Sequence, residues 1–289
     1  HNPATTAASG TPKNLFGISL IAALAGFIFG FDTVVISGAN QPIKDLWHTT
    51  PLFHGFFIMS MALWGTVVGS IFGGIPTDKF GRKKVLLWIG IFFSVSAIGS
   101  ALAQDPYTFS FFRFMGGVGI GISSVAAPTY ISEISTASTR GRLVAIYQYN
   151  IVFGILIAFL SNYFLAGFGG SNDWRWMLGV MAIPSILYTV MVLFIPESPR
   201  WLAARTEQKQ LGLQSGFFDK KYHRILWLGF LVAFFNQWSG INFILYYAPE
   251  ILQRAGLATV DSLKNSIFIG GTNLLFTFVG LYLMDRLGR

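Results

Sequence analysis

The chain has 289 residues, of which 53% are hydrophobic and 11% are charged, and its net charge is +8. About a quarter of the residues of a soluble domain are charged, so this composition excludes an ordinary soluble fold and predicts an all-α polytopic membrane protein. The basic residues stand in short segments between apolar runs, which argues against a nucleic-acid partner. Cysteine is absent, which excludes disulfides, thiolate metal sites and a cysteine nucleophile.

Eight apolar runs follow one another along the chain, each near the length of about 20 residues with which a helix crosses a bilayer. They cover residues 15–36, 53–75, 85–102, 109–131, 143–168, 176–195, 225–252 and 266–284. Residues 1–14 are small and polar, which predicts a disordered tail. We expect residues 15–199 to form a six-helix bundle and the charged residues 200–224 to form a cytoplasmic linker. Residues 225–289 would then supply the first two helices of a second bundle.

The basic residues also predict an orientation, because cytoplasmic segments of membrane proteins are enriched in Lys and Arg. With the N-terminus inside, fifteen of the 20 basic residues fall on cytoplasmic segments. Four fall on external segments, namely Lys44, Arg175, Arg254 and Lys264, and Arg113 lies inside a span. We therefore expect a multi-pass protein of the inner (plasma) membrane with a cytoplasmic N-terminus.

A five-residue pattern occurs twice, each time directly after an apolar run. Residues 78–82 read Asp-Lys-Phe-Gly-Arg, and residues 285–289 read Asp-Arg-Leu-Gly-Arg. A repeat at so wide an interval is typical of a membrane protein built from two similar halves. Because the second copy ends the chain, we expect the second half to be cut short.

Two charged residues lie inside spans, where a charge costs roughly 2.5–3.5 kcal/mol on insertion scales. Asp32 follows Leu15 by about 26 Å along a helix that runs outward, and Arg113 comes early in a helix that runs inward. Both residues therefore lie at a similar depth in the outer half of the membrane and can pair if their helices are neighbours. The pair is either a static buried ion pair or a proton site, in which protonation of Asp32 would release Arg113.

The seventh run is the most polar and the most aromatic. Its polar side chains include Asn236, Gln237, Asn242, Tyr246 and Tyr247. Amides both donate and accept hydrogen bonds, so with Gln148 in the fifth run and Asn273 in the eighth this set suits a neutral sugar. The alternative is that the amides join helices by hydrogen bonds. No metal-ligand spacing and no catalytic pattern occurs, so the sequence predicts neither an enzyme nor a cofactor.

Several motifs in order resemble the sugar porter family of the major facilitator superfamily, and most resemble bacterial proton-coupled symporters such as xylose/proton symporters. They are Gly-Phe-Asp-Thr at 30–33 with Ile-Ser-Gly at 36–38, the segment 74–83, Arg-Phe-Met-Gly-Gly at 113–117, the segments 128–133 and 140–142, Pro-Glu-Ser-Pro-Arg-Trp-Leu at 196–202, and the segment 237–250. The resemblance implies the major facilitator fold, with eight of its usual twelve transmembrane helices present.

The resemblance also implies roles for individual residues. The sugar, a pentose or a hexose, would bind Gln148, Asn236, Gln237, Asn242 and Asn273. Tyr246 and Tyr247 would help to close an outer gate, and Asp32 would carry the coupled proton with Arg113 as its partner. A cytoplasmic latch would consist of four charged clusters: Asp78/Arg82, Glu133/Arg140/Arg142, Glu197/Arg200 and Asp285/Arg289. The alternative is that these charges merely retain the bases inside.

The chain departs from the family in ways that bear on function. Asn236 stands where many members have Gln, the linker is short, and four helices would follow Arg289 in a full-length member. The leading hypothesis is a monosaccharide transporter, or a fragment of one, that works by alternating access and couples to protons through Asp32. A facilitative sugar uniporter, a sugar sensor that does not transport, and a truncated fragment without activity are the alternatives. The sequence indicates neither the sugar nor an oligomeric state.

Overall fold

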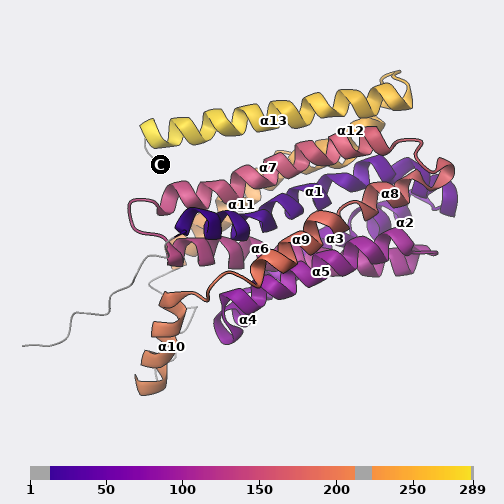
Figure 1. The fold of residues 1–289 in the computed structure, drawn as a ribbon. Coiled ribbons are helices and arrows are strands. Elements are labelled where there is room, and N and C mark those ends of the chain that lie inside the picture. Colours follow the sequence, from indigo (N-terminus) through magenta and orange to yellow (C-terminus); the bar gives the residue numbers. More distant parts are fainter. Residues whose placement is uncertain (1–13, 212–222, 288–289) are drawn as a thin grey trace, which may run out of the picture.

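The computed structural model describes residues 14–211 and 223–287, and none of these residues forms a strand. Residues 1–13 of the predicted tail and residues 212–222 of the predicted linker lie outside the described part. Most of the helices run side by side along one direction (Figure 1). The long ones are α1 (Leu15–Trp47), α5 (Arg82–Leu102), α6 (Pro106–Ile134), α7 (Arg140–Leu165) and α13 (Thr259–Leu287).

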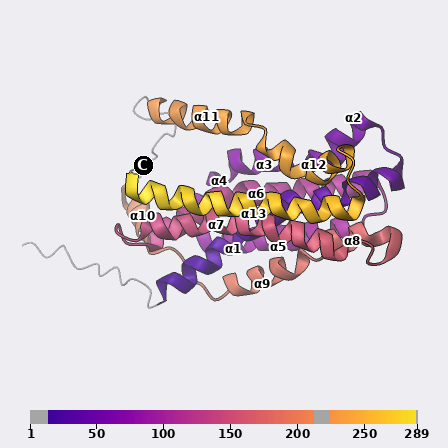
Figure 2. The same ribbon diagram turned by 90° about the horizontal axis from the view of Figure 1, so that it is seen from above.

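Shorter helices complete the arrangement. They are α2 (Pro51–Phe53), the π-helical turn η1 (His54–Met59), α3 (Met61–Phe72), α4 (Gly74–Phe80), the 3₁₀ turn η2 (Gly170–Asn172), α8 (Asp173–Gly179), α9 (Ala182–Val192), α10 (Pro199–Leu211), α11 (His223–Trp238) and α12 (Ile241–Arg254). Helix α1 packs against α7, α6 and α12, while α13 packs against α7 and α12. Figure 2 shows α13 lying along α7 and α11 set to one side of the other helices.

Glycine sets the distance between the central helices. A methyl group on Gly30 of α1 would overlap the backbone carbonyl of Ile151 on α7, and one on Gly154 would overlap that of Phe27. The same close approach joins α3 to α6, where Gly117 faces the carbonyl of Ala62. Small residues thus let membrane helices meet backbone to backbone, which gives them dispersion contacts that lipid cannot replace.

Three of the predicted spans are interrupted, and the sixth predicted span is divided into α8 and α9. The second is bent by about 40° between residues 51–59 and 61–72. The seventh, predicted as one run over 225–252, is divided into α11 and α12 at Gly240, whose φ of 76° lies in the left-handed region. A residue with a Cβ seldom adopts that conformation, which explains why the chain turns at a glycine. Six described helices are long and apolar enough to cross a membrane, or seven if the bent pair counts as one span.

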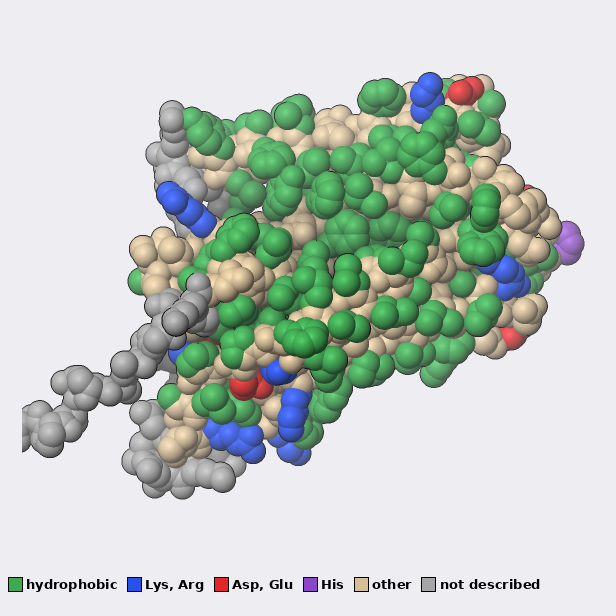
Figure 3. All heavy atoms as spheres, in the orientation of Figure 1, with side chains coloured by type: hydrophobic (Ala, Val, Ile, Leu, Met, Phe, Trp, Pro, Cys, Tyr) green, Lys and Arg blue, Asp and Glu red, His purple; other side chains and the backbone are tan. Residues whose placement is uncertain are grey.

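The surface agrees with a membrane location. Hydrophobic side chains cover the middle of the molecule on the face drawn in Figure 3, and charged side chains gather toward its two ends. One end carries α4, α10 and the residues between α6 and α7, and we call it the basic end (Figure 1). At the opposite end α1 finishes at Trp47 and α12 finishes at Arg254.

Candidate functional site

A buried ion pair joins α1 and α6. Nη1 of Arg113 donates to Oδ1 of Asp32 at 2.5 Å, and Nη2 donates to the backbone carbonyl of Asp32 at 3.1 Å. The two side chains are 1% and 0% exposed. Oδ2 of Asp32 and Nε of Arg113 are buried and have no hydrogen-bond partner among the described residues. The sequence placed both residues at one depth, and the structure brings them into contact.

The start of α6 determines where Arg113 lies. Asp105 caps this helix by accepting hydrogen bonds from the backbone N–H groups of Tyr107 and Thr108 and from the Thr108 hydroxyl. Such bonds favour the charged carboxylate, and that from the Thr108 hydroxyl contributes most to lowering the pKa of Asp105. Pro106 occupies the first helical position, where its missing N–H costs nothing. Arg113 follows two turns later and points into the bundle.

Helix α12 carries aromatic side chains next to α1. Tyr246 is 4% exposed on α12, which packs against α1, the helix that carries Asp32. Its neighbour Tyr247 is half-buried, with its ring centroid 5.3 Å from that of Phe243. The segment that the sequence predicts to carry an outer gate therefore lies directly beside the segment that it predicts to carry the proton.

The predicted sugar contacts are spread over four helices. One of these helices lies in the region 15–199 and three lie in the region 223–287. Gln148 is exposed on α7, Asn273 is half-buried on α13, and Asn242 is half-buried on the first turn of α12. Asn236 and Gln237 lie on α11, and their side chains fall outside the described part of the structure. Because α7 packs against α13, Gln148 and Asn273 belong to neighbouring helices, but no further geometry defines a sugar site here.

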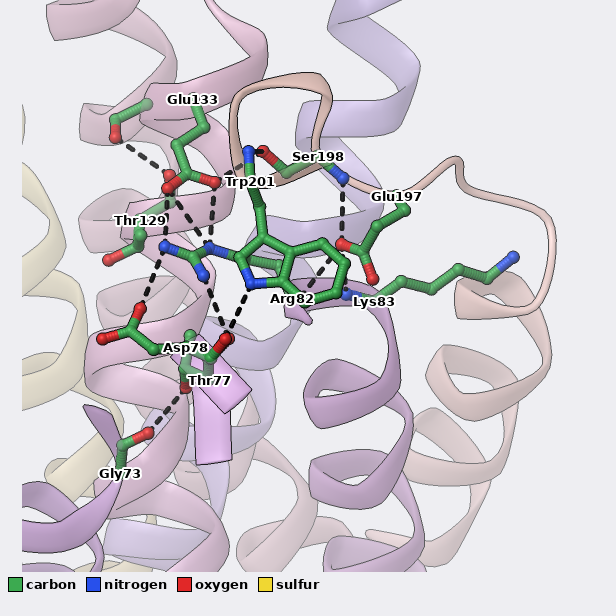
Figure 4. Close-up of polar contacts among 11 residues, drawn as sticks. Gly73, Thr77, Asp78, Arg82, Lys83, Thr129, Glu133, Glu197, Ser198 and Trp201 are labelled. Carbon is green, nitrogen blue, oxygen red and sulfur yellow. Dashed lines mark hydrogen bonds and ion pairs between the residues drawn. The ribbon is translucent and has the colours of Figure 1, made fainter. Parts of the chain in front are cut away.

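A cluster of charges at the basic end centres on Arg82 (Figure 4). Its guanidinium donates to Glu133 at distances from 2.8 to 3.2 Å and to the backbone carbonyl of Thr77 at 3.0 Å, and it forms an ion pair with Asp78 at 3.1 Å. Glu133 also accepts from the Ser198 hydroxyl at 2.5 Å. The planar guanidinium suits this role because it presents several N–H groups in a fixed geometry to a carboxylate.

Glu197 binds the start of α5 rather than a neighbouring base. Its Oε1 accepts from the backbone N–H groups of Arg82 and Lys83, both at 3.0 Å. Those N–H groups have no partner within the helix, and a carboxylate there also complements the helix dipole. Trp201 closes the cluster by donating from its indole to the backbone carbonyl of Asp78 at 2.8 Å. These bonds join α4, α5, α6 and α10.

The remaining predicted latch residues are placed differently from the clusters that the sequence suggested. Glu133 binds Arg82, whereas Arg140 donates to the backbone carbonyl of Ser132 and Arg142 is exposed. Arg200 is exposed beside Asp78 and Trp201 in a hollow at the basic end. The side chains of Asp285 and Arg289 lie outside the described part.

The sequence did not predict a second polar network, which lies at the opposite end. Nδ2 of Asn40 donates to Oε2 of Glu250 at 2.9 Å, and Oδ1 of Asn40 contacts Nε2 of His54 at 2.7 Å. Nδ1 of His54 contacts the Thr49 hydroxyl at 2.8 Å. Asn40 and Glu250 are 210 residues apart, so no local pattern could have joined them.

Comparison with known proteins gives the chain a family. The sequence profile of the family described as "Sugar (and other) transporter" matches residues 18–215 and 205–289. The arabinose-proton symporter of Bacillus subtilis is 35% identical over 94% of this chain and 66% of its own length. The glucose transport protein of Synechocystis is 36% identical over 100% of this chain and 70% of its own length. The galactose-proton symporter of Escherichia coli is 35% identical over 95% of this chain and 65% of its own length. The chain thus spans about two thirds of these relatives.

Solved structures agree with this result. The xylose transporter XylE from E. coli, in a partially occluded inward-open conformation, superposes with a TM-score of 0.82 at 31% identity, covering 95% of this chain and 74% of that one. A crystal structure of a D-xylose-proton symporter gives 0.78 at 32% identity over 94% and 69%. These proteins are transporters and not enzymes. The chain therefore belongs to the sugar transporter family and has the helical, multi-pass fold of the major facilitator superfamily.

Proposed function

We propose that the chain forms the larger part of a symporter that moves a monosaccharide together with a proton by alternating access. The observation that carries this proposal is the ion pair between Asp32 and Arg113, which is buried among apolar helices. Charges inside membrane spans are costly and are typical of ion and proton pathways. Three of the relatives are named as sugar-proton symporters, for arabinose, galactose and xylose.

Asp32 is the proton carrier in this proposal. Only one of its carboxylate oxygens contacts the Arg113 guanidinium, while Oδ2 has no hydrogen-bond partner in the described structure and can accept a proton. Protonation removes the negative charge that holds Arg113, which then needs another partner because an unpaired buried charge is costly. Because α1 packs against α12, which carries Tyr246, a change in the charge of Asp32 would be felt at the helix that leads into the second bundle.

The sugar would bind between α7, α11, α12 and α13. Gln148, Asn236, Gln237, Asn242 and Asn273 are the proposed contacts, and Tyr246 and Tyr247 would close over the sugar. Neutral amides suit hydroxyl groups because each supplies two donors and an acceptor. The basic end would face the cytoplasm, where Asp78, Arg82, Glu133 and Glu197 would form the centre of the latch.

The test of coupling is Asp32→Asn in the full-length protein expressed in cells. The variant keeps the shape of the side chain and cannot cycle a proton. We expect accumulation of radiolabelled arabinose, galactose, xylose or glucose against a gradient to be lost, while exchange of the transported sugar across the membrane continues. Accumulation that survives in Asp32→Asn would refute the assigned role.

A facilitative uniporter is the second candidate, because the Synechocystis relative is named as a glucose transport protein with no mention of a proton. The two candidates differ in a direct measurement. Sugar added to de-energised cells should make the medium more alkaline if a proton enters with it. Sugar uptake that leaves the external pH unchanged and is indifferent to a proton gradient would favour the uniporter.

A further inference from the structure

A continuous set of hydrogen bonds connects three segments at the opposite end from the basic cluster. It runs from Thr49, after α1, to His54 at the start of η1, then to Asn40 of α1 and finally to Glu250 of α12. Asn40 and His54 are 4% and 5% exposed, so the bond between them is buried, while the bonds to Glu250 and Thr49 are partly buried. We call the three residues Asn40, His54 and Glu250 the clasp.

The chemistry of the clasp fixes the direction of each bond. A carboxylate only accepts, so Asn40 presents its NH₂ group to Glu250 and therefore turns its carbonyl oxygen to His54. That oxygen also only accepts, so the proton of His54 is on Nε2. In the neutral ring Nδ1 is then an acceptor, and the Thr49 hydroxyl donates to it. His54 thus fixes the orientation in which Asn40 reaches Glu250.

The clasp connects two parts of the chain, because it joins α1 and η1 to α12. Asn40 and His54 belong to the region 15–199 predicted to form the first bundle, and Glu250 belongs to the seventh predicted span. Its other carboxylate oxygen, Oε1, binds Arg254 one turn later at 2.7 Å. Apolar contacts change gradually as two helices shift against each other, whereas a directional hydrogen bond between them is either made or broken. When broken by opening toward water, both groups are hydrated, so the bond can form and break reversibly.

A cavity of about 200 Å³ lies directly beneath the clasp, between α1, α8, α12 and α13. Asn40, Glu250 and Leu263 are among its lining residues, and Leu263 is 4% exposed. We propose that the clasp holds α1 against α12 and must release before a sugar can enter from this end, with His54 acting as a positioning residue for Asn40. The role in sugar entry rests on the proposed transport function, whereas the closure itself does not.

The experiment measures access to the cavity in the full-length protein, with Leu263→Cys as the sole cysteine and a sulfonated, membrane-impermeant maleimide as the probe. We expect Asn40→Leu to increase the labelling rate about tenfold, which corresponds to about 1.4 kcal/mol in favour of the open state. Gln41→Leu is the matched control, because exposed Gln41 binds only Asp45 on its own helix among the described partners. An unchanged rate in Asn40→Leu would overturn the proposal.

Conservative variants separate the clasp from general damage to the fold. Glu250→Gln retains an acceptor for Asn40 and should label slowly, whereas Glu250→Leu should label quickly. His54→Gln retains a donor for Asn40 and should restore the slow rate that His54→Leu loses. A second reporter, Ser19→Cys, is buried near the start of α1, at the opposite end of this helix from Asn40, and should remain unreactive in every variant. Equal labelling of the Gln and Leu variants would contradict the role of these hydrogen bonds.

Sugar transport is measured separately on the same variants. If the wild-type protein exchanges no arabinose, galactose, xylose or glucose, the proposed function fails, while the labelling rates still decide whether the clasp closes this end. If the wild type transports and Asn40→Leu changes labelling but not the rate of sugar entry, closure stands and the entry role is refuted.

Discussion

At the scale of single residues, the decisive feature is a charge pair in a place where unpaired charges are hardly tolerated. Arg113→Leu would leave the Asp32 carboxylate buried without its partner, and we expect a loss of about 3–5 kcal/mol in the free energy of unfolding. The double variant Asp32→Asn/Arg113→Leu removes both charges and should recover most of that stability. Thermal unfolding of the purified full-length protein in detergent measures the difference. Single-variant losses that simply add in the double variant would contradict the pairing.

The partner of a single residue can be predicted from the sequence only where depth in the membrane leaves few possible partners. Asp32 and Arg113 are rare charges at one depth, so the sequence alone indicated that they could pair. Asn40 and His54 lie near a span end, where water competes and many polar partners are available, so nothing singled them out. Glu133 shows the same limit, because several bases at the basic end could bind it and only the packing of α5 against α6 selects Arg82.

At the scale of elements, helices meet where side chains allow their backbones to approach. Gly30→Ala would force α1 away from the carbonyl of Ile151 on α7, which is backbone and cannot move aside like a flexible side chain. We expect this variant to give less folded protein. Its free energy of unfolding should fall by at least the cost of overpacking a core, which is about 1–3 kcal/mol. The measurement is the monomer yield and unfolding temperature after extraction from membranes.

Gly271→Ala on α13 is the matched control for this prediction, because no atom lies within 4 Å of the position that its new methyl group would occupy. Alanine favours a helix over glycine by about 0.5–1 kcal/mol, so the control should be unchanged or slightly more stable. Equal losses in the two variants would show that the α1–α7 contact is looser than the structure indicates.

The elements also show where hydrophobicity ceases to predict structure. A single apolar run over 225–252 is long enough to span a bilayer, and its hydrophobicity does not require a break, although Gly240 weakens the helix locally. The division into α11 and α12 depends on the backbone angle of Gly240, which hydrophobicity does not encode. Asn236 and Tyr247, which would share a face of one continuous helix, are therefore on separate helices.

At the scale of the whole molecule, charge is distributed between two ends that differ. The basic end holds an acid-and-base cluster that is satisfied within α4, α5, α6 and α10, while the other end holds the clasp between α1 and α12. In the described structure the polar contacts at the two ends therefore differ: those at the basic end include ion pairs and lie within the first part of the chain, whereas the clasp consists of hydrogen bonds that reach α12.

The orientation of these two ends follows from the excess of Lys and Arg at the basic end, which should be retained in the cytoplasm. Because the chain contains no cysteine, a single introduced cysteine can report on which side of the membrane it lies. Gln104 is exposed between α5 and α6 at the clasp end, and Ser138 is exposed between α6 and α7 at the basic end. In intact cells expressing the full-length protein without other cysteines, Gln104→Cys should react with an impermeant maleimide, and Ser138→Cys should react only after permeabilisation. The reverse pattern would place the clasp in the cytoplasm, and sugar entering from outside would then meet the ionic cluster first.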